Sequence, residues 1–133
     1  MGEKDLSKIP NGRPGIEPRM ELLFSEGVVK NRITLNKFVD VTSTAPAKIF
    51  GLFPKKGTIA IGGDADIVIF DPNAEHTLSA KTHHMNCDYS AYEGWKVTGK
   101  CVATILRGTV AVENGKANVK KGFGQYLSRR PNA

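Results

Sequence analysis

The spacing of hydrophobic residues changes once along this chain, near Gly51, from a helical period to a strand period. Before that point, Met20, Leu23 and Phe24 recur at the i, i+3, i+4 spacing of an amphipathic helix. After it, short β-branched runs such as residues 67–70 are separated by Gly, Asn and Asp. A self-contained α/β domain would alternate strands with helices. The sequence therefore predicts an α+β fold in which helices precede antiparallel strands, an order typical of the end of a larger protein.

Three short helices are predicted after a loop that occupies the first 16 residues, where Pro and Gly are dense. The first covers residues 18–26, and Gly27 is placed to end it. Thr34 is positioned to cap the second, whose inward side chains are Leu35, Phe38 and Val39. The third covers residues 44–50, with Ser43 and Thr44 as caps, Pro46 in its first turn and Gly51 just past its end.

Six short strands are predicted after the helices, at residues 58–61, 67–70, 76–78, 95–98, 101–106 and 109–113. Asp71 and Pro72 are expected to stop the second of these strands. The dipeptides Arg107-Gly108 and Asn114-Gly115 supply turns, and Asn-Gly is the stronger hairpin signal.

Composition supports a packed domain, since 40% of the 133 residues are hydrophobic and 24% are charged. The net charge of +6 is concentrated at one end, because residues 115–133 carry five basic side chains and no acid. Such a tail can contact nucleic acid, an acidic surface or a neighbouring subunit. We expect no nucleic-acid binding, since the tail lacks a recognition-helix pattern. No apolar run approaches the roughly 20 residues of a membrane helix, and no signal-peptide core is present, so a cytoplasmic protein is expected.

The residues that could carry chemistry give no metal or nucleophile site by their spacing. Two reduced thiols, Cys87 and Cys101, are predicted rather than a disulfide or zinc ligands. Adjacent His83 and His84 would point to opposite faces of a strand, which makes a poor chelating pair. The remaining candidates are expected to have structural roles. His76 is predicted to be a strand or surface histidine, and Asp64 and Asp66 are predicted to be turn formers. Gly57, Gly62 and Gly63 lie between predicted strands and do not form a phosphate loop.

Several longer runs resemble the C-terminal portion of hydantoinases and dihydropyrimidinases, members of the cyclic amidohydrolase superfamily. The first part of the resemblance is the loop sequence Ile-Pro-Asn-Gly at residues 9–12, followed by Pro-Gly-Ile-Glu at 14–17 and Arg-Met at 19–20. The remaining runs are residues 42–52, residues 56–72, the Ser-Ala-Lys-Thr-His-His segment at 79–84 and Glu-Gly at 93–94. The resemblance covers nearly the whole chain, and the order of the motifs is specific to that family.

This resemblance implies the last helices of a (β/α)₈ barrel followed by strands of a small β-sandwich. It divides the chain into a substrate loop and barrel helices at residues 1–52, sandwich strands at 53–114 and a basic C-terminal tail at 115–133. It also implies a two-metal centre, with two zinc ions, that opens cyclic diamides such as hydantoins and dihydropyrimidines. The family's metal ligands, which include a His-x-His pair and a carboxylated lysine, all lie upstream of the matched segment. The chain alone is therefore expected to be inactive and to bind no metal.

The resemblance places substrate binding at Asn11, whose matching position in the family holds the substrate ring through its main chain. A cyclic ureide presents alternating C=O and N–H groups, which a free backbone N–H and C=O complement. Gly12 lets the backbone come close because it has no Cβ. The alternative is that Asn11-Gly12 is simply a turn. Glu17 and Arg19 are expected to have a salt-bridge or helix-end role rather than a catalytic one.

Two other functions remain open on the sequence. The collapsin response mediator proteins are similar over the same segment but have lost the metal ligands and act as oligomeric scaffolds. The chain could also be an assembly module whose basic tail contacts neighbouring subunits of a homo-oligomer, a dimer or tetramer. The run Pro14-Gly15-Ile16-Glu17 looks more like bacterial hydantoin-opening members than animal dihydropyrimidinases.

Overall fold

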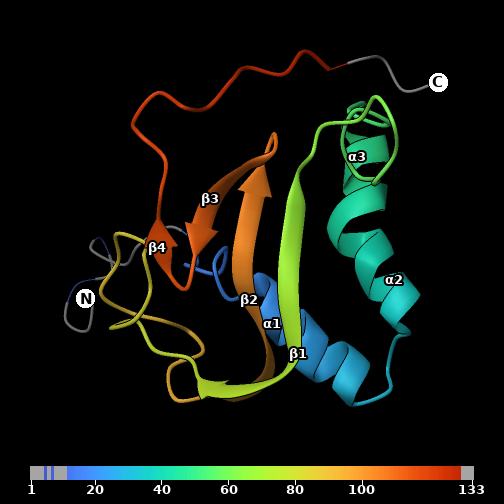
Figure 1. The fold of residues 1–133 in the computed structure, drawn as a ribbon. Helices are drawn as coiled ribbons and strands as arrows, with labels where there is room; N and C mark the ends of the chain where they lie inside the picture. The colour runs from blue at the N-terminus through green and yellow to red at the C-terminus, as the bar shows by residue number, and fades with distance from the viewer. Residues whose placement is uncertain (1–4, 6, 8–11, 130–133) are drawn as a thin grey trace.

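A computed structural model describes residues 5, 7 and 12–129 and contains two helices followed by one antiparallel sheet (Figure 1). The first helix joins α1 (Arg19–Leu23) to the π-helical segment η2 (Phe24–Val29). The second joins α2 (Leu35–Val39), the π-helical segment η3 (Asp40–Thr44) and α3 (Ala45–Ile49). The strands, in the spatial order of the sheet, are β1 (Ile67–Thr77), β2 (Lys96–Leu106), β3 (Thr109–Glu113) and β4 (Lys116–Ala117).

The first helix extends beyond its predicted end. Gly27 lies inside η2 rather than at a C-cap, so that prediction is wrong. A Cβ on Gly27 would sit 3.0 Å from the side chain of Ile33, so glycine here allows the following chain to pack closely. The left-handed residue that follows the helix is Asn31, with φ of 54°, a conformation that asparagine tolerates better than most residues. The helix therefore ends where its backbone reverses, two residues after η2.

The second helix unites two predicted helices. Thr34 caps it as predicted, because its Oγ1 accepts a hydrogen bond from the Lys37 amide at 3.1 Å. The helix continues through Pro46 because the wider π turn of η3 precedes the proline, whose ring would clash with a carbonyl in a regular α-helix. Thr44 is consequently inside the helix and is not a side-chain cap; its hydroxyl donates to the Gly57 carbonyl at 2.7 Å. Gly51, with φ of 66°, ends the helix as predicted.

The strands are longer than predicted because they run through two apparent breakers. β1 continues past Pro72, and residues 72–74 form an irregularity opposite the single Gly99 of β2. Gly99 itself, with φ of +100°, joins the two predicted strands 95–98 and 101–106 into β2. A bulge of this kind bends a strand without ending it. The predicted strand 109–113 is confirmed as β3, and the turn at Asn114 and Gly115 leads into β4.

The predicted strand at residues 58–61 is wrong. This segment forms turns, in which the Gly63 amide donates to the Ala60 carbonyl at 3.1 Å and the Asp64 amide donates to the Lys55 carbonyl at 2.8 Å. Ile59 is 85% exposed. The β-branched residues of the segment 58–61 favour a strand, but within the described part of the chain this segment pairs with no strand.

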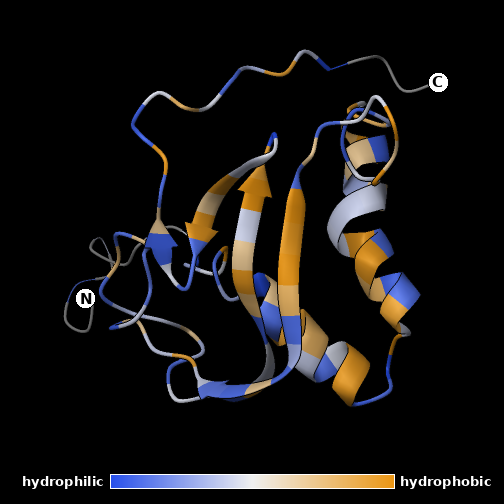
Figure 2. Ribbon diagram, in the orientation of Figure 1, coloured by the Kyte–Doolittle hydropathy of each residue, from blue (hydrophilic) through white to orange (hydrophobic). Residues whose placement is uncertain are grey.

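Three aromatic rings join the helices to the sheet. Phe24 of the first helix lies 5.5 Å from Phe38 of the second and 4.8 Å from Phe70 of β1, measured between ring centroids. Phe24 and Phe38 are buried, and hydrophobic residues are concentrated in the first half of β1, which contains Phe70 (Figure 2). Gly99 is the floor of the cluster, since a Cβ there would lie 2.6 Å from Phe24 and 2.7 Å from Phe70. The helices can approach the sheet only because β2 has no side chain at this position.

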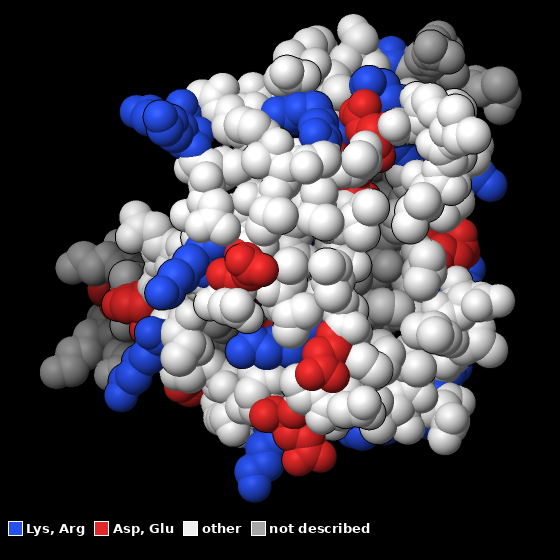
Figure 3. Space-filling model, viewed as in Figure 1, with Lys and Arg blue, Asp and Glu red and all other residues white. Residues whose placement is uncertain are grey.

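Charged side chains are interspersed over the face seen in Figure 3, with broad uncharged areas between them. Among the described residues, no helix is long and apolar enough to cross a membrane.

Replacing Gly99 with alanine should destabilise the fold more than the same change at Gly108. Both glycines have positive φ, +100° and +76°, but Gly108 has no atom within 4 Å of the added Cβ. Gly108→Ala should therefore lose about 1–2 kcal/mol of unfolding free energy through backbone strain alone. Gly99→Ala should lose a further ~1–3 kcal/mol through overpacking against Phe24 and Phe70. Urea unfolding of both variants measures the difference, and equal losses would contradict the role assigned to Gly99.

Candidate functional site

The predicted substrate loop enters the structure at Gly12, since Asn11 lies outside the described residues. Gly12 has φ of +99°, and no atom lies within 4 Å of the position where its Cβ would be. Both features fit a backbone that turns sharply with one side left open. The loop continues to Glu17 and is anchored by Pro18, whose side chain is fully buried immediately before α1. Residues 12–17, called the ring loop below, are thus fixed at their C-terminal end by the first helix.

A second loop, residues 79–94 between β1 and β2, lies beside the ring loop; it is called the support loop below. Its two ends are held together by the sheet, because the Leu78 amide donates to the Trp95 carbonyl at 2.9 Å. Loops of this length whose ends meet are packed by their own side chains. The support loop is therefore a closed unit attached to the end of the β1–β2 pair.

Glu93 closes the support loop a second time. One carboxylate oxygen accepts a hydrogen bond from the Ser79 hydroxyl and the other accepts one from the Ala80 amide, each at 2.7 Å. The bond from the Ala80 amide and then the bond from Ser79 hold the pKa of Glu93 below its usual value. The carboxylate remains charged at neutral pH and keeps both ends of the loop together.

Two tyrosines of the support loop contact the ring loop. The Arg13 guanidinium lies over the Tyr92 ring, 5.9 Å from its centroid, within the range of a cation–π contact. A Cβ on Gly15 would be in van der Waals contact with the same ring, at 3.9 Å. The Tyr89 hydroxyl donates a long hydrogen bond of 3.5 Å to the Gly12 carbonyl. The ring loop therefore lies against an aromatic surface.

His84 makes the strongest link between the two loops. Its Nδ1 lies 2.8 Å from one Glu17 carboxylate oxygen, and its backbone amide donates to the other at 2.7 Å. Its Nε2 lies 2.7 Å from the Gly115 carbonyl in the turn between β3 and β4. The Glu17 bond and then the Gly115 bond raise the pKa of His84 above its usual 6.5. Burial opposes ionisation of Glu17, but the hydrogen bonds from His84 outweigh it and lower the pKa of that carboxyl.

These contacts decide two expectations drawn from the sequence. Glu17 has the predicted salt-bridge role, and its partner is His84. The expectation that His83 and His84 lie on a strand is wrong, because both belong to the irregular support loop. Their neighbourhood is set by contacts with distant segments and not by strand alternation.

A hollow of about 570 Å³ lies between the first helix, the sheet and the support loop. His76 and Glu21 meet on its wall, with Nε2 3.0 Å from the carboxylate, and both ring nitrogens of His83 are buried without a hydrogen-bond partner. Cys101 is half-buried there, and burial, followed by the nearby Glu21 charge, raises the pKa of its thiol to about 11. Both cysteines are free thiols, as predicted. Within residues 5, 7 and 12–129, no group of three or more His, Cys, Asp or Glu could hold a metal ion.

Asp64 and Asp66 were expected to be turn formers that bond local amides. This expectation is wrong, because their carboxylates bond to groups elsewhere in the chain. Lys55 and Lys56 pair with Asp64 at 2.7 and 2.8 Å, and Lys56 also pairs with Asp66. The hydrogen bonds from the two lysines hold the pKa of Asp64 below its usual value. Asp66 accepts a further hydrogen bond from the Arg107 amide at 2.8 Å, which ties this region to the turn between β2 and β3.

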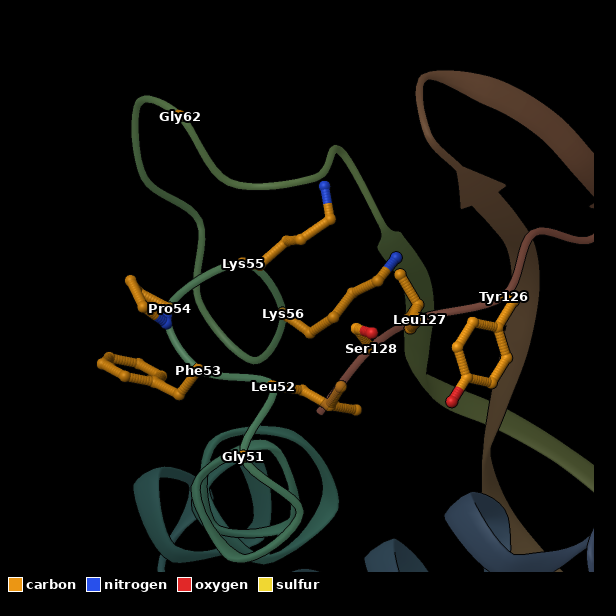
Figure 4. Close-up of a pocket in the computed structure, with 10 residues that line it drawn as sticks. All are labelled: Gly51, Leu52, Phe53, Pro54, Lys55, Lys56, Gly62, Tyr126, Leu127 and Ser128. Atoms are coloured by element: carbon orange, nitrogen blue, oxygen red, sulfur yellow. The ribbon is translucent and has the colours of Figure 1, made fainter. Parts of the chain in front are cut away.

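A second pocket, of about 460 Å³, separates the segment after α3 from the C-terminal tail (Figure 4). Tyr126, Leu127 and Ser128 line it on the tail side, facing the segment of residues 51–56. The tail is held at a residue that precedes this pocket in the sequence, Phe123. The Arg107 guanidinium donates to the Phe123 carbonyl at 2.6 Å and lies over the Phe123 ring, 4.5 Å from its centroid. The tail then runs above the sheet toward α3 (Figure 1). This pocket contains none of the ring-loop residues.

Sequence reasoning missed Tyr89, Tyr92 and the carbonyl of Gly115. The tyrosines are grouped with Trp95 in one short aromatic stretch, which was the available signal. Nothing in the local pattern pairs that stretch with a loop some 77 residues earlier in the chain.

Comparison with known proteins connects these features to a family. The sequence model described as the amidohydrolase family matches residues 14–111. The chain is 58% identical to a D-hydantoinase of Geobacillus stearothermophilus over 129 residues, which are 97% of this chain and 27% of that protein. It is 48% identical to a dihydropyrimidinase of Rattus norvegicus, covering 98% of this chain and 25% of the relative.

Solved structures give the same result for the fold. A crystal structure of a D-hydantoinase matches with a TM-score of 0.91 and 60% identity, covering 97% of this chain and 28% of that one. The structure of a dihydropyrimidinase from Brevibacillus agri NCHU1002 matches with a TM-score of 0.91 and 53% identity, covering 98% and 29%. The chain thus spans about a quarter of the length of these relatives. Its sequence and its fold both show that it belongs to the amidohydrolase family.

Proposed function

We propose that this chain is the C-terminal part of a hydantoinase-type hydrolase that opens cyclic amides, hydantoins or dihydropyrimidines. The observation that carries the proposal is the 0.91 TM-score at 60% identity to a D-hydantoinase over 97% of the chain. In this proposal residues 1–52 complete a (β/α)₈ barrel, residues 53–114 contribute to a β-sandwich, and residues 115–133 form a basic tail.

The chain's part in the reaction is substrate binding and orientation. In this proposal the backbone N–H and C=O of Asn11 bind the alternating donors and acceptors of a cyclic ureide. Gly12, with its positive φ and open Cβ position, lets the ring approach the backbone. Holding the ring in a fixed pose lowers the entropic part of the barrier to attack on its carbonyl.

The described residues do not fit a two-zinc centre. His84 is engaged by Glu17 and Gly115, and His76 by Glu21. The two ring nitrogens of His83 have no hydrogen-bond partner, but among the described residues His83 belongs to no group of three or more His, Cys, Asp or Glu that could hold a metal ion. We therefore assign no hydrolytic step to this chain and place the metal ligands of the proposed enzyme in the part of the protein that precedes the matched segment.

The pure 133-residue chain should show no ring opening of hydantoin or dihydrouracil, with zinc or manganese added, because it cannot build a metal-bound nucleophile. By contrast, a chimera in which this chain replaces the matching 27% of the Geobacillus stearothermophilus D-hydantoinase should be active. Ring opening is followed by ultraviolet absorbance, and the unaltered relative is the control. Turnover by the chain alone, or a folded, zinc-loaded chimera without activity, would contradict the proposal.

If Asn11 binds the substrate through its main chain, two substitutions at this position should have different effects on KM. Asn11→Ala keeps the backbone N–H and should leave the KM of the chimera nearly unchanged. Asn11→Pro removes that donor and should raise KM about tenfold, the effect expected for one lost hydrogen bond. Steady-state kinetics of both variants test this, and equal KM values would favour the alternative that Asn11-Gly12 is only a turn.

An assembly role for the tail is a second proposal, supported by its course. Arg107 holds the tail at Phe123, and beyond that point Tyr126 is 93% exposed. An extended basic segment with an exposed tyrosine is suited to contact a neighbouring subunit of a homo-oligomer. A non-catalytic scaffold of the collapsin response mediator type is the alternative to a hydrolase.

Replacing Arg129 and Arg130 together with Glu should weaken self-association, because the change reverses two positive charges near the end of the tail. Replacing Lys96 and Lys100 with Glu, which reverses two charges at exposed positions of β2, is the matched control and should change association less. Sedimentation velocity measures the oligomer fraction. An unchanged profile for the tail variant would exclude this role.

A further inference from the structure

The ring of His84 is bonded at both nitrogens by groups that only accept. Nδ1 faces the Glu17 carboxylate at 2.8 Å and Nε2 faces the Gly115 carbonyl at 2.7 Å. A neutral imidazole carries one N–H, so one of these contacts would then set a lone pair against an oxygen. Both bonds form together only when the ring carries two protons and a positive charge.

Three distant segments meet at this one side chain. Glu17 ends the ring loop, His84 belongs to the support loop, and Gly115 lies in the turn between β3 and β4. The His84 amide adds a second bond to Glu17, so the carboxylate is held at both oxygens. A change at His84 would therefore release the ring loop from the sheet as well as from the support loop.

The other contacts between the ring loop and the support loop are weaker than those of His84. The contacts from Tyr89 and Tyr92 are a 3.5 Å hydrogen bond and a 5.9 Å cation–π contact, both near the upper limit for such interactions. Charge-assisted bonds of 2.7–2.8 Å are stronger than these. The His84 contacts are thus the main fixed point between Gly12 and the first helix.

We propose that His84 is a positioning residue whose imidazolium holds the ring loop in the conformation that receives the substrate. This inference rests on the proposed function, because the substrate is the cyclic amide assigned there. His84 does not contact the reacting atoms and acts through Glu17. The chemistry recognised by the loop is unchanged by the state of His84; the fraction of time for which the loop is in place is what changes.

The pH dependence follows from the two groups that form the contact. Because the pKa of His84 is raised above 6.5, the contact is fully present below that value and is lost as pH rises through the folded-state pKa. Because the pKa of Glu17 is lowered below 4.5, its contribution is lost only as pH falls through that lower value. Of the neighbouring groups, His83 on the same loop also lowers the pKa of Glu17, whereas the β3–β4 turn presents a carbonyl.

The test measures backbone order in the ring loop by ¹⁵N relaxation of the 133-residue chain. In the wild type, the order parameters of Gly12, Arg13, Gly15 and Ile16 should be near the rigid value of about 0.85 at about pH 6, and should fall toward about 0.6 at about pH 8.5. His84→Gln should give low values at both pH values. His84→Arg, a permanent cation with several donors, should restore high values at both.

His83→Gln is the matched control, since its ring nitrogens have no hydrogen-bond partner in the described structure; it should follow the wild type. Unchanged order in His84→Gln, or wild-type order that does not depend on pH, would overturn the inference. In the chimera, the KM of the wild type should rise as pH increases and His84 loses its proton. His84→Gln should raise KM several-fold with little change in kcat, and its KM should no longer rise with pH. The relaxation result stands by itself if the chimera is inactive, so failure of the proposed function is separable from failure of this inference.

Discussion

The contact between three phenylalanines and one glycine holds the helical and sheet parts of this chain together. Phe24, Phe38 and Phe70 come from the first helix, the second helix and β1, and they meet over Gly99 of β2. Gly99 lies opposite the irregular residues 72–74 of β1, so the bend in the sheet and the docking of the helices have one origin. Further bonds follow the same seam, where the Ser25 hydroxyl accepts from the Thr98 amide at 3.2 Å.

The position of the ring loop depends on this seam in two ways. Its C-terminal end leads through the buried Pro18 into the first helix, which the aromatic cluster sets on the sheet. Its side is held by the support loop, which begins where β1 ends and returns where β2 begins. The helix follows the ring loop directly in the sequence, whereas the support-loop residue His84 lies 67 residues after Glu17. The sheet therefore determines the position of both groups that hold the ring loop.

Local signals predicted those features whose cause is local. The order of helices and strands, the Thr34 cap, the helix end at Gly51 and the Asn114-Gly115 turn follow from side chains and glycines acting on their neighbours. The error at Pro72 has a distant cause, since this proline did not end the strand because Gly99 of β2 lies opposite residues 72–74. Glu17 was expected to pair, but its partner His84 is 67 residues away. The family resemblance located the ring loop, whereas its aromatic support required the fold.

Because the support loop is attached to the end of the β1–β2 pair, the register of these two strands also determines contacts outside the sheet. Leu78 and Trp95 continue the β1–β2 ladder by one step beyond the pair Thr77 and Lys96. A slip of one residue between these strands would move the base of the loop by about 3.4 Å and turn alternate side chains to the other face. Tyr92 and His84 would then leave Arg13 and Glu17. Substitutions deep in the sheet can thus change where the ring loop lies, although they touch none of its residues.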